Sequence, residues 1–132
     1  MIFMFDTDTV SFFMKDNPKE VRIKFAKHEK DEFCISAITY AELIFGLKKN
    51  YSKKLDLWLN EVLDRFKVIP FDLASSIIYG DIRTTLEKSG NPLDNMDMLI
   101  AASALAAKAT LVSNNVKHFS RIKGLKIEDW SK

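Results

Sequence analysis

The sequence is poor in the residues that build disulfide scaffolds and zinc sites. Its single cysteine, Cys34, excludes a disulfide within the chain, and a reducing cytoplasm is the usual setting for such a composition. The two histidines, His28 and His118, each stand beside a lysine, so we expect them on the solvated surface rather than around a metal. Neither a disulfide framework nor a zinc centre is therefore expected.

Long hydrophobic runs and a strong net charge are also missing. The apolar run from Met98 to Ala107 is too short to span a bilayer, and the first five residues lack the basic segment of a secretory signal. Lys and Arg number 20 against 18 Asp and Glu, so the net charge of +2 excludes a protein that coats nucleic acid through bulk charge. We expect a cytoplasmic protein without a membrane partner, and any contact that it makes with nucleic acid should be local.

The length and hydrophobic content suit one domain. The chain has 132 residues, 47% of them hydrophobic, which is enough for a core that buries roughly two-thirds of the unfolded surface. No linker, repeat or low-complexity segment interrupts it. We therefore expect a single domain over residues 1–132.

Short apolar runs alternate with longer segments of helical period, which is typical of an α/β domain with a largely parallel sheet. The expected strands are rich in β-branched or aromatic residues. They are Ile2 to Phe5, Phe33 to Ala37, Lys67 to Pro70, Thr110 to Ser113 and Leu125 to Glu128.

Helices are expected between these strands. Pro18 fits the first turn of one helix, because its missing N–H would be unpaired there in any case. Other helical segments are Thr9 to Met14, Leu55 to Phe66, Ala74 to Leu86 and Asn95 to about Lys108. The last of these is apolar almost all round and should be buried.

Three acidic residues fall where strands give way to helices. Asp6 directly follows the first strand, Glu42 is expected in the first turn after the second strand, and Asp97 is expected in the first turn of the buried helix. Ligand sites in open parallel sheets form beyond the carboxyl ends of the strands, so these three acids could converge in one crevice.

Helix capping is an alternative role for each acid. Thr39-x-x-Glu42 matches a capping box. Asp6, Thr7 or Asp8 could cap the first helix, and Asp94 or Asn95 could cap the buried one, with Asp97 gaining from the helix dipole. From these residues alone, both roles remain open.

Convergence of the acids would require a cation. Capping contributes about 1 kcal/mol, whereas two carboxylates about 4 Å apart repel by roughly 4 kcal/mol at a surface-like dielectric. Hard oxygen ligands suit Mg²⁺ or Mn²⁺, which usually keep several waters. Such an ion activates water and neutralises charge on phosphodiester oxygens, which is nuclease chemistry.

The motifs together resemble the VapC toxins of the PIN-domain ribonuclease family, and the resemblance covers nearly the whole chain. The matching segments are Met4 to Asp8, Ile38 to Gly46, Gly90 to Ala101 and Leu111 to Phe119, followed by Gly124-Leu and Asp129-Trp130. This resemblance implies a PIN-domain-like three-layer fold, a short mostly parallel sheet flanked by helices, and a metal-dependent endoribonuclease that inhibits translation.

The resemblance also implies site residues and partners. It makes Asp6, Glu42 and Asp97 the catalytic and metal-binding triad, with Ser113 and Asn115 lining the same pocket. The implied cofactor is Mg²⁺, with Mn²⁺ as a substitute. The implied partners are a VapB-type antitoxin, operator DNA only indirectly through that antitoxin, and a second copy of the chain in a homodimer.

The leading hypothesis for the substrate is a tRNA, cut in the anticodon loop and possibly the initiator tRNA, because similar VapC toxins cut there. A loop with unstacked bases is where proteins read RNA sequence most readily. The basic stretch of Lys48, Lys49, Lys53 and Lys54 could bind tRNA phosphates, or it could be a solvated helix end.

The chain departs from the family pattern at three positions. Asp8 stands where the opening motif usually has Asn, and it could be an extra acid or a cap. Asn115 stands where many PIN domains have a fourth acid, so we expect one metal rather than two. Asp94 lies in a variable loop and is expected to cap a helix rather than to join the triad.

Two other function classes deserve comparison. The opening Ile2 to Val10 also resembles haloacid-dehalogenase-type phosphotransferases, in which Asp6 would be a nucleophile and Asp8 a general acid. That family needs a late acidic pair after an apolar strand, but Leu111 to Asn115 contains no carboxylate. A non-catalytic binding module is the third possibility, although most of the ten phenylalanines fall on patterns that a core would use.

Overall fold

All 132 residues, from Met1 to Lys132, are described by a computed structural model. The five strands are β1 (Ile2–Phe5), β2 (Glu32–Ser36), β3 (Lys67–Ile69), β4 (Thr110–Val112) and β5 (Ile127–Glu128). They form one sheet in the order β3-β2-β1-β4-β5, and every neighbouring pair is parallel. The helices are α1 (Thr7–Lys15), α2 (Glu20–Lys27), α3 (Ala37–Lys49), α4 (Lys53–Arg65), α5 (Leu73–Lys88), α6 (Asn95–Ala106) and α7 (Val116–Phe119).

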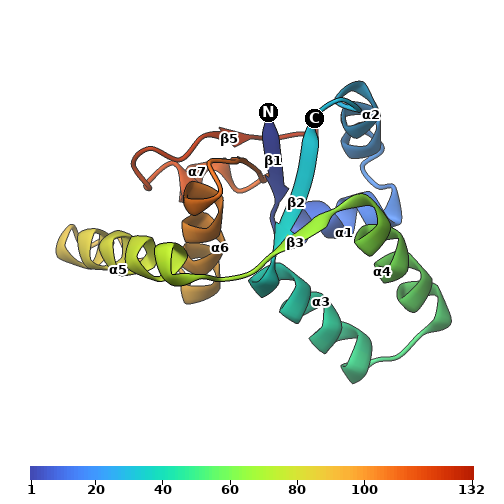
Figure 1. The fold of residues 1–132 in the computed structure, drawn as a ribbon, viewed down its shortest axis with the longest axis horizontal. Coiled ribbons are helices and arrows are strands. Elements are labelled where there is room, and N and C mark those ends of the chain that lie inside the picture. The colour runs from blue at the N-terminus through green and yellow to red at the C-terminus, as the bar shows by residue number, and fades with distance from the viewer.

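Side chains on the sheet alternate between its two faces, and each face carries a separate hydrophobic core. Phe3 and Phe5 of β1 point to the face covered by α1, α2 and α4, whereas Met4 points to the face covered by α5 and α6. The molecule therefore has three layers, with helices on both sides of the sheet (Figure 1). The expected α/β class, with a parallel sheet flanked by helices, is confirmed.

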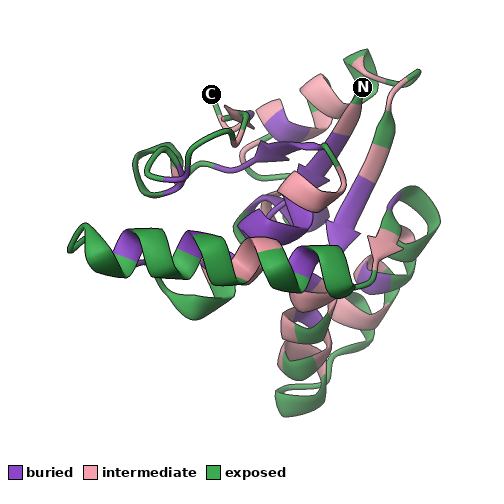
Figure 2. Ribbon diagram, turned by 60° about the vertical axis from the view of Figure 1, so that its left-hand side comes forward, coloured by how far each residue is buried: buried purple, intermediate pink, exposed green.

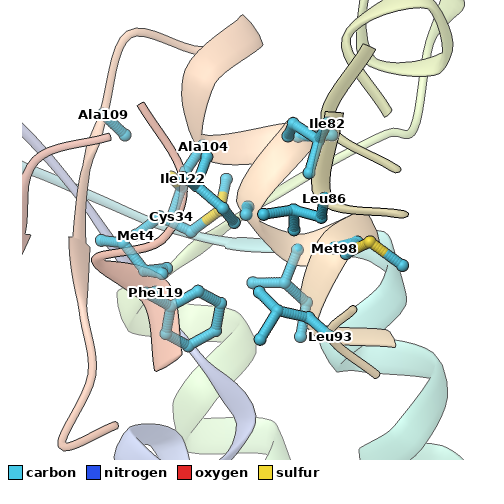
Figure 3. Packing of buried hydrophobic residues seen from close by; sticks show 14 residues of the cluster. Met4, Cys34, Ile82, Leu86, Leu93, Met98, Ala104, Ala109, Phe119 and Ile122 are labelled. Carbon is cyan, nitrogen blue, oxygen red and sulfur yellow. The ribbon is translucent and has the colours of Figure 1, made fainter. Parts of the chain in front are cut away.

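Helix α6 is the centre of the second core. Its near-continuous apolar sequence is buried, as expected, and the buried residues are Met98, Ile100, Ala101, Ala102, Ser103 and Ala104. Around it, Met4 and Cys34 of the sheet meet Ile82 and Leu86 of α5 (Figure 3). Helix α5 lies outside α6 and exposes most of its own surface (Figure 2).

The strand register aligns the ends of the three central strands. Phe5 pairs with Val112, so Asp6 and Ser113 follow on adjacent strands, and Met4 pairs with Cys34, so Ser36 ends β2 at the same edge. The backbone N–H of Asp6 also donates to the carbonyl of Val112 at 3.1 Å. This shared edge is where α1 and α3 begin, and it positions the candidate site.

The beginning of α3 differs from the prediction. Ser36 is its N-cap, and the Ser36 hydroxyl accepts a hydrogen bond from the N–H of Thr39 at 3.0 Å. Thr39 is therefore inside the helix, and Glu42 lies in its second turn rather than the first. The predicted Thr39–Glu42 capping box is wrong, because Ser36 at the strand end already fills the cap position.

Two other expected features are also corrected. Helix α2 begins at Glu20, so Pro18 precedes the helix instead of forming its first turn. His28 is only partly exposed: its ring stacks on Trp130 with 4.9 Å between centroids, and its Nδ1 lies 2.9 Å from Asp31. The charged neighbours of His28 suggested a surface position, whereas the folding of the C-terminal segment against β1 provides an aromatic partner.

None of the helices combines the length and the apolar character that a membrane crossing would require.

Candidate active site

Asp6 lies at the carboxyl end of β1 and is buried, with 6% of its surface exposed. It is the N-cap of α1, and its Oδ1 accepts a hydrogen bond from the N–H of Thr9 at 2.9 Å. Burial raises the pKa of Asp6, as does the charge of Asp8, while hydrogen bonds from Ser113 and Thr9 act in the opposite direction. Asp6 therefore caps a helix and is also a buried carboxylate, so capping does not rule out a role in the site.

Glu42 reaches the same edge of the sheet from α3. Its Oε1 accepts a hydrogen bond of 2.6 Å from the hydroxyl of Thr7, the residue directly after Asp6. The Thr7 hydroxyl also lies 3.3 Å from that of Thr39 on α3. This contact joins α1 to α3 and brings Glu42 beside the end of β1.

Asp97 is half-buried in the first turn of α6, where it was expected. Burial is the main reason that its pKa is raised, followed by the negative charges of Asp94 and Asp6 and, more weakly, Glu42. The charge of His118 acts in the opposite direction. The structure thus brings Asp6, Glu42 and Asp97, from three distant parts of the sequence, into one electrostatic environment.

Ser113 and Asn115 follow β4 beside these acids. Ser113 is fully buried, its hydroxyl acts to lower the pKa of Asp6, and it accepts a hydrogen bond from the N–H of Asn115 at 2.9 Å. Asn115 occupies the N-cap position of α7, but its side chain makes no capping hydrogen bond. Its amide is therefore not committed to the helix.

The acids do not form a closed metal cage. No three His, Cys, Asp or Glu side chains lie close enough together to enclose an ion. The donor atoms that these acids offer are carboxylate oxygens, which suit Mg²⁺ or Mn²⁺, and Mg²⁺ usually keeps several waters and uses one or two carboxylates together with substrate phosphate oxygens.

Several other residues considered from the sequence lie outside this group. Asp94 is the exposed N-cap of α6, as expected, and accepts from the N–H of Met96 at 3.1 Å. Asp8 is exposed in the first turn of α1 and does not cap the helix. The lysines at positions 48, 49, 53 and 54 are exposed where α3 ends and α4 begins. The main surface hollows, including one of about 260 Å³ between α5 and Ile122, are not lined by the triad.

Two residues near the acids were missed by the sequence reasoning. His118 is exposed, as expected, but its charge acts on Asp97, and it is carried by α7, a four-residue helix too short to show a periodic pattern. Thr7 was considered only as a possible cap. Its contact with Glu42 joins residues 35 positions apart, so it depends on the packing of α1 against α3.

Comparison with known proteins identifies the family of this chain. Residues 3–125 match the PIN domain family. The chain is 36% identical to the tRNA(fMet)-specific endonuclease VapC of Salmonella typhimurium, over 97% of each protein. It is 37% identical to Ribonuclease VapC2 of Rickettsia felis, over the full length of both. The crystal structure of VapBC2 from Rickettsia felis, bound to a DNA fragment from their promoter, superposes with a TM-score of 0.92, covering 98% of this chain and 99% of that one.

Proposed function

Because the chain belongs to the PIN-domain family and, within it, to the VapC ribonucleases, we propose that it is a metal-dependent endoribonuclease and the toxin of a toxin–antitoxin pair. The observation that carries the metal site is the field around Asp97, whose pKa is raised first by burial, then by the charges of Asp94 and Asp6 and, more weakly, by that of Glu42. Acids that repel one another at the end of a sheet are stabilised by a cation.

Asp6, Glu42 and Asp97 would hold the ion, in part through the waters that Mg²⁺ keeps, and Ser113 would keep Asp6 oriented through its hydroxyl. When bound, Mg²⁺ or Mn²⁺ would supply activation of water and neutralisation of charge on the phosphodiester. Asn115 has a free amide at the edge of the group, which suits a contact with substrate or with water. With a neutral amide at this position, we propose one tightly held ion rather than two.

An RNase assay on purified protein tests this proposal. We expect cleavage with Mg²⁺ or Mn²⁺, and loss of cleavage when a chelator is in excess, because none of the side chains is proposed as the nucleophile. The Asp97→Asn variant serves as the inactive control for contaminating nucleases. Cleavage by the parent that persists in excess EDTA would remove the metal site from the proposal.

We propose initiator tRNA as the substrate, cut in the anticodon loop. The support is the Salmonella typhimurium relative, whose name specifies tRNA(fMet). Mapping of cut ends in total RNA, after brief expression of the protein, would reveal the target. Cleavage confined to other RNAs would redirect the substrate assignment and leave the nuclease proposal intact.

The proposed partners are a VapB-type antitoxin and a second copy of this chain, with promoter DNA contacted through the antitoxin. Support comes from the DNA-bound VapBC2 structure. Large apolar side chains also remain exposed, among them Phe45, Leu57, Leu73 and Ile77, and exposed apolar groups of this size often mark protein interfaces. Sedimentation of the protein with and without its antitoxin would determine both associations.

The phosphotransferase alternative has little structural support. It requires Asp8 to act beside Asp6, but Asp8 is exposed in the first turn of α1. Activity on a chromogenic phosphate ester, lost in Asp6→Asn, would be needed to revive it. The binding-module alternative would require parent and triad variants to be equally inactive on every RNA tested.

A further inference from the structure

Glu42 is held differently from the other two acids of the triad. The side chain of Asp6 caps α1 and accepts from the N–H of Thr9, and Asp97 has a short side chain in the first turn of α6. Glu42 lies in the second turn of α3 and has a longer side chain with more rotamers to lose. Its one hydrogen bond in the structure comes from the Thr7 hydroxyl, at 2.6 Å.

Chemistry determines which hydroxyl group near Glu42 donates and which accepts. A distance of 2.6 Å is typical of a charge-assisted O–H···O⁻ bond, so the single proton of Thr7 points to Glu42. The Thr7 oxygen can then only accept from Thr39, whose hydroxyl lies 3.3 Å away. The Thr39 oxygen is in turn 3.5 Å from the Ser36 hydroxyl, a weaker contact.

Burial favours these contacts between hydroxyl groups. Ser36 and Thr39 are both fully buried, so water does not compete for their hydroxyl groups. Ser36 is fixed as the N-cap of α3, where its oxygen accepts from the N–H of Thr39. This series of hydroxyl contacts therefore begins at a rigid point, Ser36 at the end of β2. It continues through the hydroxyl groups of Thr39 and Thr7 to the carboxylate of Glu42.

We propose that Thr7 is a positioning residue that holds Oε1 of Glu42 and leaves Oε2 available to a divalent cation, with Thr39 setting the direction of the Thr7 hydroxyl. The inference rests on the proposed function, because it concerns the ion that Glu42 would help to hold. Partners of metal-binding carboxylates usually affect metal affinity by about 10–100-fold when they are removed.

The test measures Mn²⁺ binding in the absence of RNA, by electron paramagnetic resonance of the free ion. Thr7→Val keeps the shape and removes the hydroxyl, and we expect the dissociation constant to rise by about 10–100-fold. Thr7→Ser keeps the hydroxyl and should restore most of the affinity. Thr39→Val should cause a smaller loss in the same direction.

Thr110→Val is the matched control. Thr110 is also buried, but it lies at the start of β4, away from the carboxyl end where the acids gather. We expect parental Mn²⁺ affinity and parental cleavage from this variant. A loss equal to that of Thr7→Val would mean that removal of any buried hydroxyl weakens the protein, and would overturn the inference.

A double variant identifies the path of the effect. If Thr7 acts through Glu42, then Thr7→Val combined with Glu42→Gln binds Mn²⁺ no more weakly than Glu42→Gln alone. Cleavage by Thr7→Val should recover at high Mg²⁺ with an unchanged KM for RNA. Additive losses, or a loss that Mg²⁺ does not rescue, would contradict the positioning role.

The outcomes also separate this inference from the proposed function. If Thr7→Val binds Mn²⁺ as tightly as the parent does, the inference is overturned and the proposed function is unaffected. A parent that neither binds Mn²⁺ nor cleaves RNA would overturn both. Circular dichroism of each variant shows whether it is folded, and if Thr7→Val does not fold, the comparison of Thr39→Val with Thr110→Val decides in its place.

Discussion

A single substitution can separate the local role of Asp6 and Asp97 at a helix start from their proposed role as metal ligands. Asparagine caps a helix about as well as aspartate, but it lacks the charge that a hard cation needs. We therefore expect Asp6→Asn and Asp97→Asn to abolish cleavage while keeping the fold. Each variant should be at least as stable as the metal-free parent, because removing a charge relieves repulsion and the cost of burial.

The metal response of these variants provides the measurement. For the parent, Mg²⁺ at ten times its dissociation constant should add about 1.4 kcal/mol, seen as a higher melting temperature. The Asn variants should show a much smaller rise. If parent and variants melted alike throughout a Mg²⁺ titration and all cleaved RNA, Asp6 would serve only as the cap of α1 and Asp97 only as an acid in the first turn of α6.

The raised pKa values of Asp6 and Asp97 give a pH dependence with a definite sign. Between pH 3.8, the ordinary pKa of an aspartate, and the raised pKa of each acid, the folded protein holds these protons more tightly than the unfolded chain does. Without metal, the two acids therefore lower the free energy of unfolding as pH rises through this window. Mg²⁺ binds the ionised form, so its stabilising effect should grow over the same range.

Comparison of Asp97→Asn with the parent isolates the pH dependence of stability that Asp97 causes. Asp31, Glu61 and Asp72 have lowered pKa values and change stability in the opposite direction, but they are common to both proteins. The difference in free energy of unfolding between variant and parent, measured by urea titration at several pH values, should widen as pH rises. A constant difference would contradict the raised pKa of Asp97.

At the residue scale, the sequence located the acids better than their contacts. Asp6 and Asp97 were placed correctly because a strand end and a helix start are local features that composition marks. The hydrogen bond of Thr7 to Glu42, the charge of His118 near Asp97 and the stacking of His28 on Trp130 each join segments far apart in the chain. Such contacts depend on tertiary packing, which no local pattern encodes.

At the scale of the element, a helix cap outside the site should affect stability without affecting chemistry. Ser52 is the N-cap of α4 and accepts a hydrogen bond from the N–H of Leu55 at 3.0 Å, far from the triad in sequence and exposed to solvent. Ser52→Ala should lower the free energy of unfolding by about 1 kcal/mol. RNA cleavage at saturating Mg²⁺ should be unchanged.

Ser52→Asn is the matched control, because asparagine is also a good N-cap and should keep parental stability. Urea unfolding of the three proteins, with cleavage assayed in parallel, makes the comparison. Loss of cleavage in Ser52→Ala with an intact fold would show that the start of α4 contributes to the site, for example through RNA contacts of the neighbouring lysines.

Element boundaries show where sequence patterns lose information. Helix α6 was recognised because its nearly continuous apolar run has no other place than a core. Its end was placed two residues too late, since Lys108 is in the left-handed conformation, with φ of 56°, which ends the helix without glycine. The start of α3 was misplaced because Thr39 and Glu42 have the spacing of a capping box, although Ser36 at the strand end takes that position.

At the scale of the whole molecule, we expect the acids at one end of the sheet to contribute to the contact with an antitoxin. Carboxylates without a basic partner invite a bidentate arginine, so we expect the antitoxin tail to place an arginine side chain at Asp6 and Asp97. Binding should weaken as salt rises from about 0.1 M to about 1 M, because screening shortens the reach of these charges.

The measurement is the affinity of the purified antitoxin for the parent and for Asp97→Asn at both salt concentrations. The variant should bind more weakly and depend less on salt. Ser52→Asn, which changes neither charge nor the site, should behave as the parent. An affinity that ignores both salt and the substitution would place the antitoxin entirely on apolar surfaces.

The buried position of Cys34 has a practical consequence. Only 2% of this residue is exposed, and burial raises the pKa of its thiol to about 11, so at neutral pH it is a protonated group inside the core. Thiol reagents attack the thiolate, which is scarce and shielded here. A cysteine introduced at Phe45 or Ile77 would therefore be the only labelled position. A fluorophore there could report binding of the antitoxin or of a second subunit, and Cys34 would not need to be replaced.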